Sequence, residues 1–125
     1  MKKHYISPHV TIYKFPITAL SSISTRLSGL YLSGLFVGYG VTQMMGIDLY
    51  NKYSKLKGVK KSAVDYSLLI PGTYHTFSGM RHFVWDRYPS LLNNKHVARS
   101  SYFLFGITLG TSIVTERYLN FNTDI

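Results

Sequence analysis

The stretch LSGLYLSGLFVGYGVTQMMGI, residues 27–47, decides the fold, because none of its 21 residues is charged. A helix that crosses a bilayer needs about 20 predominantly apolar residues, so this stretch predicts a membrane-spanning helix. We expect that helix to cover residues 18–47 and to start after Pro16. Its glycines and serines predict close packing against other helices, because small side chains let helices approach each other in lipid.

Two more spanning helices are predicted, over residues 63–87 and 98–118. The third has an uncharged centre, residues 100–115, whereas the longest uncharged run in the second is only 66–80. Ionisable side chains in a spanning helix usually face the interior of a bundle, and an amphipathic surface helix is the alternative for this segment. Residues 48–65 carry five lysines and are expected to form a loop outside the hydrocarbon. The predicted fold class is therefore an all-α integral membrane protein with three transmembrane helices.

The length, net charge and cysteine content of the chain exclude several classes of function. The chain has 125 residues, a net charge of +9 and no cysteine. This length predicts a single domain, and the basic residues are not arranged as a nucleic-acid-binding face. The absence of cysteine excludes disulfides, thiolate metal sites and iron–sulfur ligation by this chain. Residues 1–17 lack the apolar core of a secretory signal and are expected to form an arm at the membrane surface.

The predicted spans also fix which segments share a side of the membrane. The N-terminal arm and the loop between the second and third helices lie on one side, and the lysine-rich loop and the C-terminus lie on the other. Lys and Arg are slightly more frequent on the first side, which favours an inside N-terminus. We expect several anchors at the membrane interfaces among the aromatic residues Tyr31, Tyr74, Trp85, Tyr88, Tyr102 and Tyr118.

A first cluster of candidate site residues lies at the entry of the first span. Ser22 and Arg26 are four residues apart and therefore share a helix face. A hydroxyl beside a guanidinium suits a neutral carbonyl ligand or a carboxylate. The alternative is a helix cap followed by an arginine that extends to the lipid headgroups.

A second cluster lies on the second span. His75, Gly79, His82 and Asp86 follow one another at i, i+4, i+7 and i+11, which is a continuous helix face. Eleven residues at 1.5 Å each place His75 roughly 16 Å deeper than Asp86. A neutral imidazole at that depth, with no cysteine in the chain, suits haem iron as its partner, and Gly79 leaves room for a flat macrocycle. A histidine that only bonds to a neighbouring helix is the alternative. Arg26, Arg81, His82 and Asp86 are expected to gather at one membrane surface above His75.

Both clusters lie within sequence signatures of a known family. Residues 7–13, SPHVTIY, followed by Ser22-x-x-x-Arg26-x-x-Gly29, resemble the N-terminal signature of the cytochrome b subunit of succinate dehydrogenase. A second signature of that family is similar to His75-x-x-x-Gly79-x-Arg81-His82-x-x-Trp85-Asp86. The resemblance implies the large membrane-anchor subunit of respiratory complex II, packed with a small anchor subunit around a haem. It also implies that flavoprotein and iron–sulfur subunits are held to the mitochondrial inner membrane, or to a bacterial inner membrane as the alternative.

The resemblance also implies roles for individual residues. His75 corresponds to an axial ligand of haem b, whose second ligand comes from the small anchor subunit. Ser22 and Arg26 correspond to residues of the ubiquinone pocket. Thr25 stands where many members have a histidine near a haem propionate. The remaining candidates for propionate contact, or for support of the quinone-binding groups, are Ser24, Thr25, Arg81, His82 and Asp86.

Three functions are compared on this basis. The first is an electron-transfer membrane anchor that carries no succinate chemistry itself, since nothing in it could bind flavin or a cluster. The second is a structural or assembly anchor that has lost the haem. The third is a separate bis-histidine cytochrome that uses His75 and His82, which lie about 10 Å apart along one helix and so could not ligate the same iron.

Overall fold

The computed structural model describes residues 14–123, and the regular structure of this range is helical. The elements are α2 (Ile17–Met44), α3 (Leu49–Ser54), α4 (Val59–Arg87), the short 3₁₀ helix η1 (Pro89–Leu91) and α5 (Asn94–Thr123). Three long helices thus lie where the sequence predicts them, although α4 and α5 each begin four residues earlier than expected. The predicted surface arm and the first part of the N-terminal signature, within residues 1–13, fall outside the described residues.

The helix boundaries follow from local chemistry. Pro16 precedes the first turn of α2, and its carbonyl accepts from the amides of Ala19 and Leu20 at 3.0 and 3.2 Å. A proline at this place costs nothing, because its missing N–H would have no helical partner there. At the other end of α2, Gly46 adopts a φ of 71°, which a residue with a side chain rarely adopts, and the helix stops.

The expectation of a loop over residues 48–65 is corrected by the structure. Asp48 caps α3 by accepting the Asn51 amide proton at 3.0 Å, and this stabilises a six-residue helix inside the predicted loop. Gly58, with a φ of 57°, then turns the chain directly into α4. The lysines of this segment therefore lie on two helix ends and a short connection.

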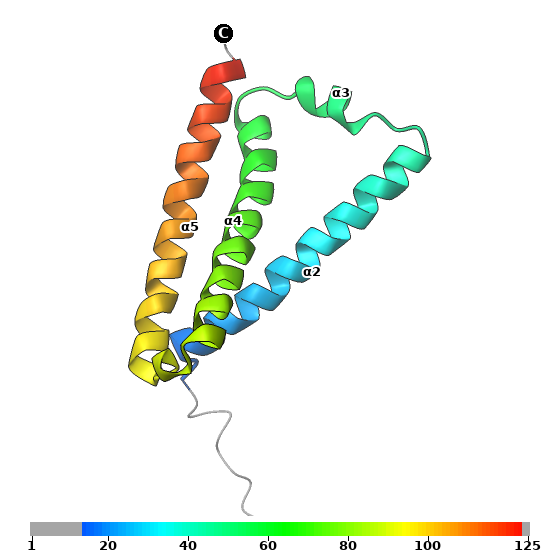
Figure 1. Cartoon of the computed structure of the whole chain (residues 1–125). Helices are drawn as coiled ribbons and strands as arrows, with labels where there is room; N and C mark the ends of the chain where they lie inside the picture. The colour runs from blue at the N-terminus through cyan, green and yellow to red at the C-terminus, as the bar shows by residue number, and fades with distance from the viewer. Residues whose placement is uncertain (1–13, 124–125) are drawn as a thin grey trace, which may run out of the picture.

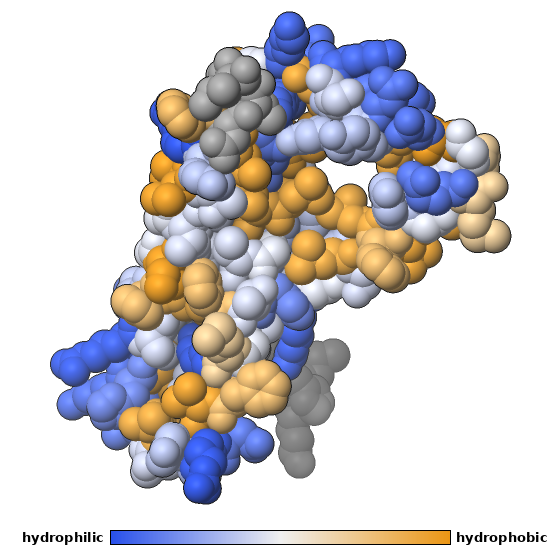
Figure 2. Space-filling model, turned by 45° about the horizontal axis from the view of Figure 1, so that its top comes forward, coloured by the Kyte–Doolittle hydropathy of each residue, from blue (hydrophilic) through white to orange (hydrophobic). Residues whose placement is uncertain are grey.

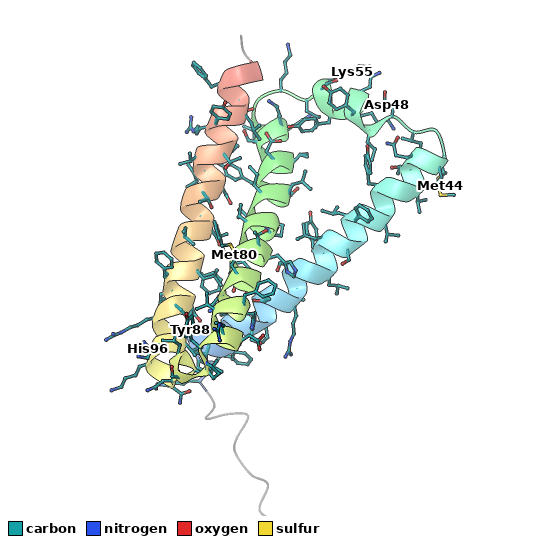
Figure 3. All side chains as sticks on the ribbon, viewed as in Figure 1. Met44, Asp48, Lys55, Met80, Tyr88 and His96 are labelled. Carbon is teal, nitrogen blue, oxygen red and sulfur yellow. The ribbon has the colours of Figure 1, made fainter. Side chains whose placement is uncertain are left out.

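The three long helices form an open arrangement (Figure 1). α4 and α5 run side by side in opposite directions along most of their length. α2 packs against both near its N-terminal end and then diverges, so that its C-terminal end is joined to the top of α4 only through α3. Figure 3 places Met44, Asp48 and Lys55 toward one end of the molecule and Tyr88 and His96 at the other. The start of α2 and the end of α4 therefore meet at the same end.

Small polar residues occupy the helix contacts, and large apolar residues face outward. The fully buried side chains are serines: Ser21, Ser78, Ser101 and Ser112. Large apolar side chains are exposed along all three long helices, and Figure 2 shows many of them on the surface. This distribution suits a helix bundle whose outer surface meets lipid or other apolar helices, since small residues permit close helix contact there.

Within the described residues, one helix is long and apolar enough to cross a membrane by length and composition. It is α5, over Asn94–Phe121. Hydropathy therefore identifies one candidate span, where the sequence analysis expects three.

Candidate functional site: His75 and the crossing of α2 and α4

His75 lies where α4 passes α2, and its ring rests against the α2 backbone. The Nδ1 atom lies 3.2 Å from the Thr25 carbonyl oxygen and 3.3 Å from the Ser28 hydroxyl. A carbonyl oxygen only accepts hydrogen bonds, so Nδ1 carries the proton and donates it to Thr25. The Ser28 hydroxyl donates to the same carbonyl at 2.9 Å. This arrangement leaves Nε2 of an exposed imidazole with a free lone pair, which is the tautomer that a metal requires.

Gly29 makes this placement of His75 possible. A Cβ atom at Gly29 would lie 2.7 Å from Cε1 of the His75 ring, closer than real Cβ contacts allow. By contrast, a Cβ at Gly79, one turn along α4 from His75, would meet nothing within 4 Å. The two glycines therefore differ: Gly29 admits the ring, and Gly79 keeps the adjoining face of α4 open.

His82 and Asp86 continue the exposed face of α4 that starts at His75 and Gly79. Together with Gly79 they line a groove of about 710 Å³, whose other lining residues are Phe83, Trp85, Pro89 and Leu92. The His82 ring meets the edge of Trp85 at 5.3 Å between ring centroids. The groove is mainly aromatic and apolar, with one imidazole and one carboxylate, and it suits a large flat ligand that carries a few polar groups.

Ser22 and Arg26 are exposed at the start of α2 and face away from the helix contacts. Within the described part of the chain, neither side chain has a hydrogen-bond partner, so both remain available to a ligand or to another subunit. The Thr25 hydroxyl donates to the Ser21 carbonyl of its own helix at 2.9 Å. Ser24 lines a different cavity, of about 590 Å³, between α2, α4 and α5.

Arg81 points into the helix junction. Its Nη2 donates to the Ser21 hydroxyl of α2 at 2.8 Å, and its Nη1 donates to the Ser101 hydroxyl of α5 at 3.0 Å. The guanidinium carbon lies 4.5 Å from the centre of the Trp85 ring. Of the four residues expected to gather at one surface, Arg81 is thus joined to the start of α2, while Arg26, His82 and Asp86 are exposed there.

Tyr74 is the buried partner that sequence reasoning missed. It is one of the six aromatic residues among which we expect interfacial anchors. In the structure it is 4% exposed, and its hydroxyl donates to the Ser21 carbonyl at 3.0 Å. The signal was available in the spacing: Tyr74, Ser78, Arg81 and Trp85 repeat the i, i+4, i+7, i+11 pattern one residue before the His75 face. A phenol that finds a buried acceptor in this way does not need water.

A separate polar cluster joins α3, α4 and α5 at the opposite end of the molecule. The Tyr53 hydroxyl donates to the Asp65 carboxylate at 2.5 Å, and Asp65 is 4% exposed. This hydrogen bond, together with burial and the negative charge of Asp65, raises the pKa of Tyr53 to about 12. Glu116, also buried, accepts from the Ser62 hydroxyl at 2.6 Å and from the Asn120 amide at 2.7 Å.

Comparison with known proteins places this geometry in context. Residues 1–115 match the family described as "Succinate dehydrogenase/Fumarate reductase transmembrane subunit". The chain is similar to the mitochondrial "Succinate dehydrogenase cytochrome b560 subunit" of Dictyostelium discoideum, with 29% identity over 86% of this chain and 58% of that protein. The cytochrome b560 subunit of Reclinomonas americana is 34% identical over 82% of this chain and 76% of its own length. The human protein is 30% identical over 65% of this chain, which spans about half of the human length, 52%.

Proposed function

Because the chain belongs to the family of succinate dehydrogenase and fumarate reductase transmembrane subunits, we propose that it is a membrane-anchor cytochrome b subunit of respiratory complex II. Its relatives named cytochrome b560 subunits support this assignment and a location in the mitochondrial inner membrane. In this role the chain holds the iron–sulfur and flavoprotein subunits to the membrane and does no succinate chemistry of its own. We further propose that it is the larger of two anchor subunits.

We propose that α2, α4 and α5 all span the membrane. The helices contain 28, 29 and 30 residues, and each is longer than the roughly 20 residues that a span requires. The buried small residues and outward apolar residues support this arrangement, as does the placement of most charged side chains toward the helix ends. The ionisable residues of α4 lower its mean hydropathy. We propose that α4 carries them because they serve the site and the helix contacts.

The observation that carries the functional proposal is the hydrogen bond from Nδ1 of His75 to the Thr25 carbonyl. It fixes the tautomer that presents Nε2 as a ligand, and Gly79 leaves the adjacent face of α4 open. These residues fit a b-type haem, which His75 would hold through Nε2 together with a histidine of the small anchor subunit. When bound, the haem supplies one-electron redox chemistry. His82 and Asp86 line the groove beside Gly79, and we propose that they would meet polar substituents of the macrocycle.

Ser22 and Arg26 are proposed to hold the ubiquinone head group. Both are exposed, lie one helical turn apart and have no competing hydrogen bond within residues 14–123. A guanidinium and a hydroxyl can both donate to a quinone carbonyl oxygen, and reduction of the quinone increases the negative charge on that oxygen. The donors would therefore bind the partly reduced head group more strongly than the oxidised one.

The test is a comparison of His75→Ala with His82→Ala in the purified complex, using the reduced-minus-oxidised optical spectrum. His75→Ala should abolish or grossly alter the low-spin b-type spectrum, whereas His82→Ala should shift it only slightly. Loss of the spectrum in His82→Ala but not in His75→Ala would reverse the assignment. A wild-type complex that assembles without haem would instead identify the chain as a purely structural anchor.

A further inference from the structure

The hydrogen bonds around Arg81 form a closed set that joins all three long helices. Arg81 donates to Ser21 and Ser101, which are 1% and 0% exposed. Ser101 passes its own proton to the Val97 carbonyl at 2.8 Å. Because the Tyr74 hydroxyl proton goes to the Ser21 carbonyl, the Ser21 hydroxyl donates to the Tyr74 oxygen at 3.1 Å. Each hydroxyl therefore has a donor and an acceptor in this set.

We propose that Arg81 is a positioning residue that fixes the rotation of α2 about its own axis. Through that rotation it aims Ser22 and Arg26 at the quinone and holds the Thr25 carbonyl against His75. The inference rests on the proposed function, because it assigns to Arg81 the alignment of the quinone-binding and haem-binding groups. Arg81 itself touches neither ligand in this role.

The geometry of α2 explains why its rotation matters. Successive residues of a helix point about 100° apart, so Ser21 can be held inward only while Ser22 points along the outer face. Ser21 and Ser28 are buried, whereas Ser22 and Arg26 are exposed. If α2 rolled by one residue, Ser22 would move into the helix contact and the Thr25 carbonyl would leave Nδ1 of His75.

The contacts that oppose such a roll lie in the first half of α2. Beyond its first turns α2 diverges from α4 and α5, and from Ser33 to Met44 it has no buried residue (Figure 1). The polar contacts that α2 makes with the other long helices are confined to Ser21, Thr25 and Ser28. Of these, Ser21 accepts a hydrogen bond from Arg81 of α4, and the same guanidinium also donates to Ser101 of α5.

A guanidinium suits this task better than any other side chain. Its planar fork reaches two hydroxyls on different helices at once, whereas a lysine ammonium is a single point with a flexible stem. The Nε atom of Arg81 is buried without a partner among the described residues, so the group is not fully satisfied. An apolar side chain would pack here without that desolvation cost, and stability alone therefore does not account for an arginine at this position.

Two neighbouring serines of α5 provide a matched test. Ser100 and Ser101 both donate to the Val97 carbonyl, at 3.0 and 2.8 Å, but only Ser101 also receives a proton from Arg81. Ser101 has no hydrogen bond to α2 and is connected to it through Arg81. The assembled wild-type complex is compared with Ser101→Ala, Ser100→Ala, Arg81→Lys and the exposed-site control Arg87→Lys, with rates normalised to assembled complex.

We expect Ser101→Ala and Arg81→Lys to raise the KM for a soluble quinone about fivefold, the effect of one lost hydrogen bond. Succinate oxidation by an artificial water-soluble acceptor should stay unchanged, and the low-spin haem signal should shift without loss of haem. Ser100→Ala and Arg87→Lys should match the wild type in all three measurements. The inference would be overturned if Ser101→Ala and Arg81→Lys both kept the wild-type KM and haem signal, or if Ser100→Ala had an equal effect. The proposed function would survive either result. A wild-type complex that does not reduce quinone would overturn the proposed function and this inference with it.

Discussion

Gly29 and His75 illustrate how one missing side chain controls a reactive group. The His75 ring occupies the place where a Cβ at Gly29 would be, and this contact brings Nδ1 within hydrogen-bond distance of the Thr25 carbonyl. The sequence pattern predicts that Gly79 alone leaves room for the macrocycle. It could not identify Gly29, because the contact joins residues 46 positions apart on two helices, and sequence spacing reports only neighbours on the same helix.

Gly29→Ala should displace the His75 ring and alter or abolish the low-spin haem spectrum while the complex still assembles. The added methyl group would meet the end of a side chain, which can move, so we expect a change at the ring and no unfolding of α2. The optical spectrum and haem content of the purified complex measure the effect. Gly106→Ala, at a helix position with nothing within 4 Å, is the control and should keep both. An unchanged spectrum in Gly29→Ala would contradict the predicted contact.

Arg26→Ala should lower quinone reductase activity by about tenfold or more, the effect of losing a charged hydrogen bond. Succinate oxidation by a water-soluble acceptor should be preserved, because that reaction bypasses the anchor. The two activities are measured on the same assembled sample, with Arg87→Ala as a control at another exposed arginine of this chain. A parallel loss of both activities would argue against a role of Arg26 at the quinone.

At the scale of the elements, α4 presents two parallel faces with different tasks. His75, Gly79, His82 and Asp86 form the exposed face, and Tyr74, Ser78, Arg81 and Trp85 form the face toward the other helices. The sequence was sufficient to predict the position of α4 and the composition of its exposed face. The direction of Arg81 could not be predicted, because the positions of its acceptors, Ser21 and Ser101, depend on how three helices cross.

The expectation of a loop over residues 48–65 was wrong for a similar reason, since α3 and the start of α4 lie there. The five lysines predict a loop outside the hydrocarbon, but charge does not exclude helix. Asp48 and Gly58 are the residues that divide the segment into α3 and the start of α4. Their effect on helix ends is local and can be predicted from the sequence. The hydrogen bond from Tyr53 to Asp65 that holds α3 in place cannot, because it depends on how α3 packs against α4.

The contact between α3 and α4 predicts a specific dependence of stability on pH. The folded state raises the pKa of Tyr53 from 10.0 to about 12, because the phenol donates to Asp65. A group whose pKa is raised on folding contributes its full stabilisation below its unfolded pKa. That contribution is therefore complete below pH 10 and is lost as the pH rises toward 12.

Tyr53→Phe should destabilise the complex at neutral pH by about 1–3 kcal/mol, because it leaves the buried Asp65 carboxylate without its donor. The variant should also lose stability less steeply than the wild type above pH 10. Unfolding temperatures measured from pH 7 to pH 11 test both effects. Tyr50 lies on the same helix and is 76% exposed, so Tyr50→Phe is the control and should follow the wild-type curve. Parallel curves for Tyr53→Phe and wild type above pH 10 would disprove the assignment.

At the scale of the whole molecule, the two ends have different chemistry. The start of α2 and the end of α4 lie at one end, and α3 lies at the other (Figures 1 and 3). The groove at His82 is lined by the end of α4 and by η1. We expect the catalytic subunits to bind at the first end, where the proposed quinone-binding residues are.

Protease added on the side opposite the flavoprotein should therefore cleave between Lys55 and Lys61 in sealed membrane vesicles. This segment connects α3 to α4, and all its lysines except the half-buried Lys61 are exposed. Immunoblotting of the fragments measures cleavage, and vesicles of the opposite orientation provide the control. Cleavage from the same side as the flavoprotein would invert the proposed topology.

The divergence of α2 has a consequence for how cells would control the amount of this chain. In Figure 2 an opening separates the outer part of α2 from the rest of the molecule, and Phe36 and Met44 are 79% and 90% exposed. An unassembled copy thus displays an uncovered helix with glycines at 34, 38 and 40, where an added Cβ would meet nothing within 4 Å among residues 14–123. This uncovered face distinguishes an unassembled copy from an assembled one, so membrane proteases that degrade unassembled subunits would have a surface to recognise. The surface that a partner covers in the complex would then mark surplus copies for degradation, which would keep the subunits in equal number.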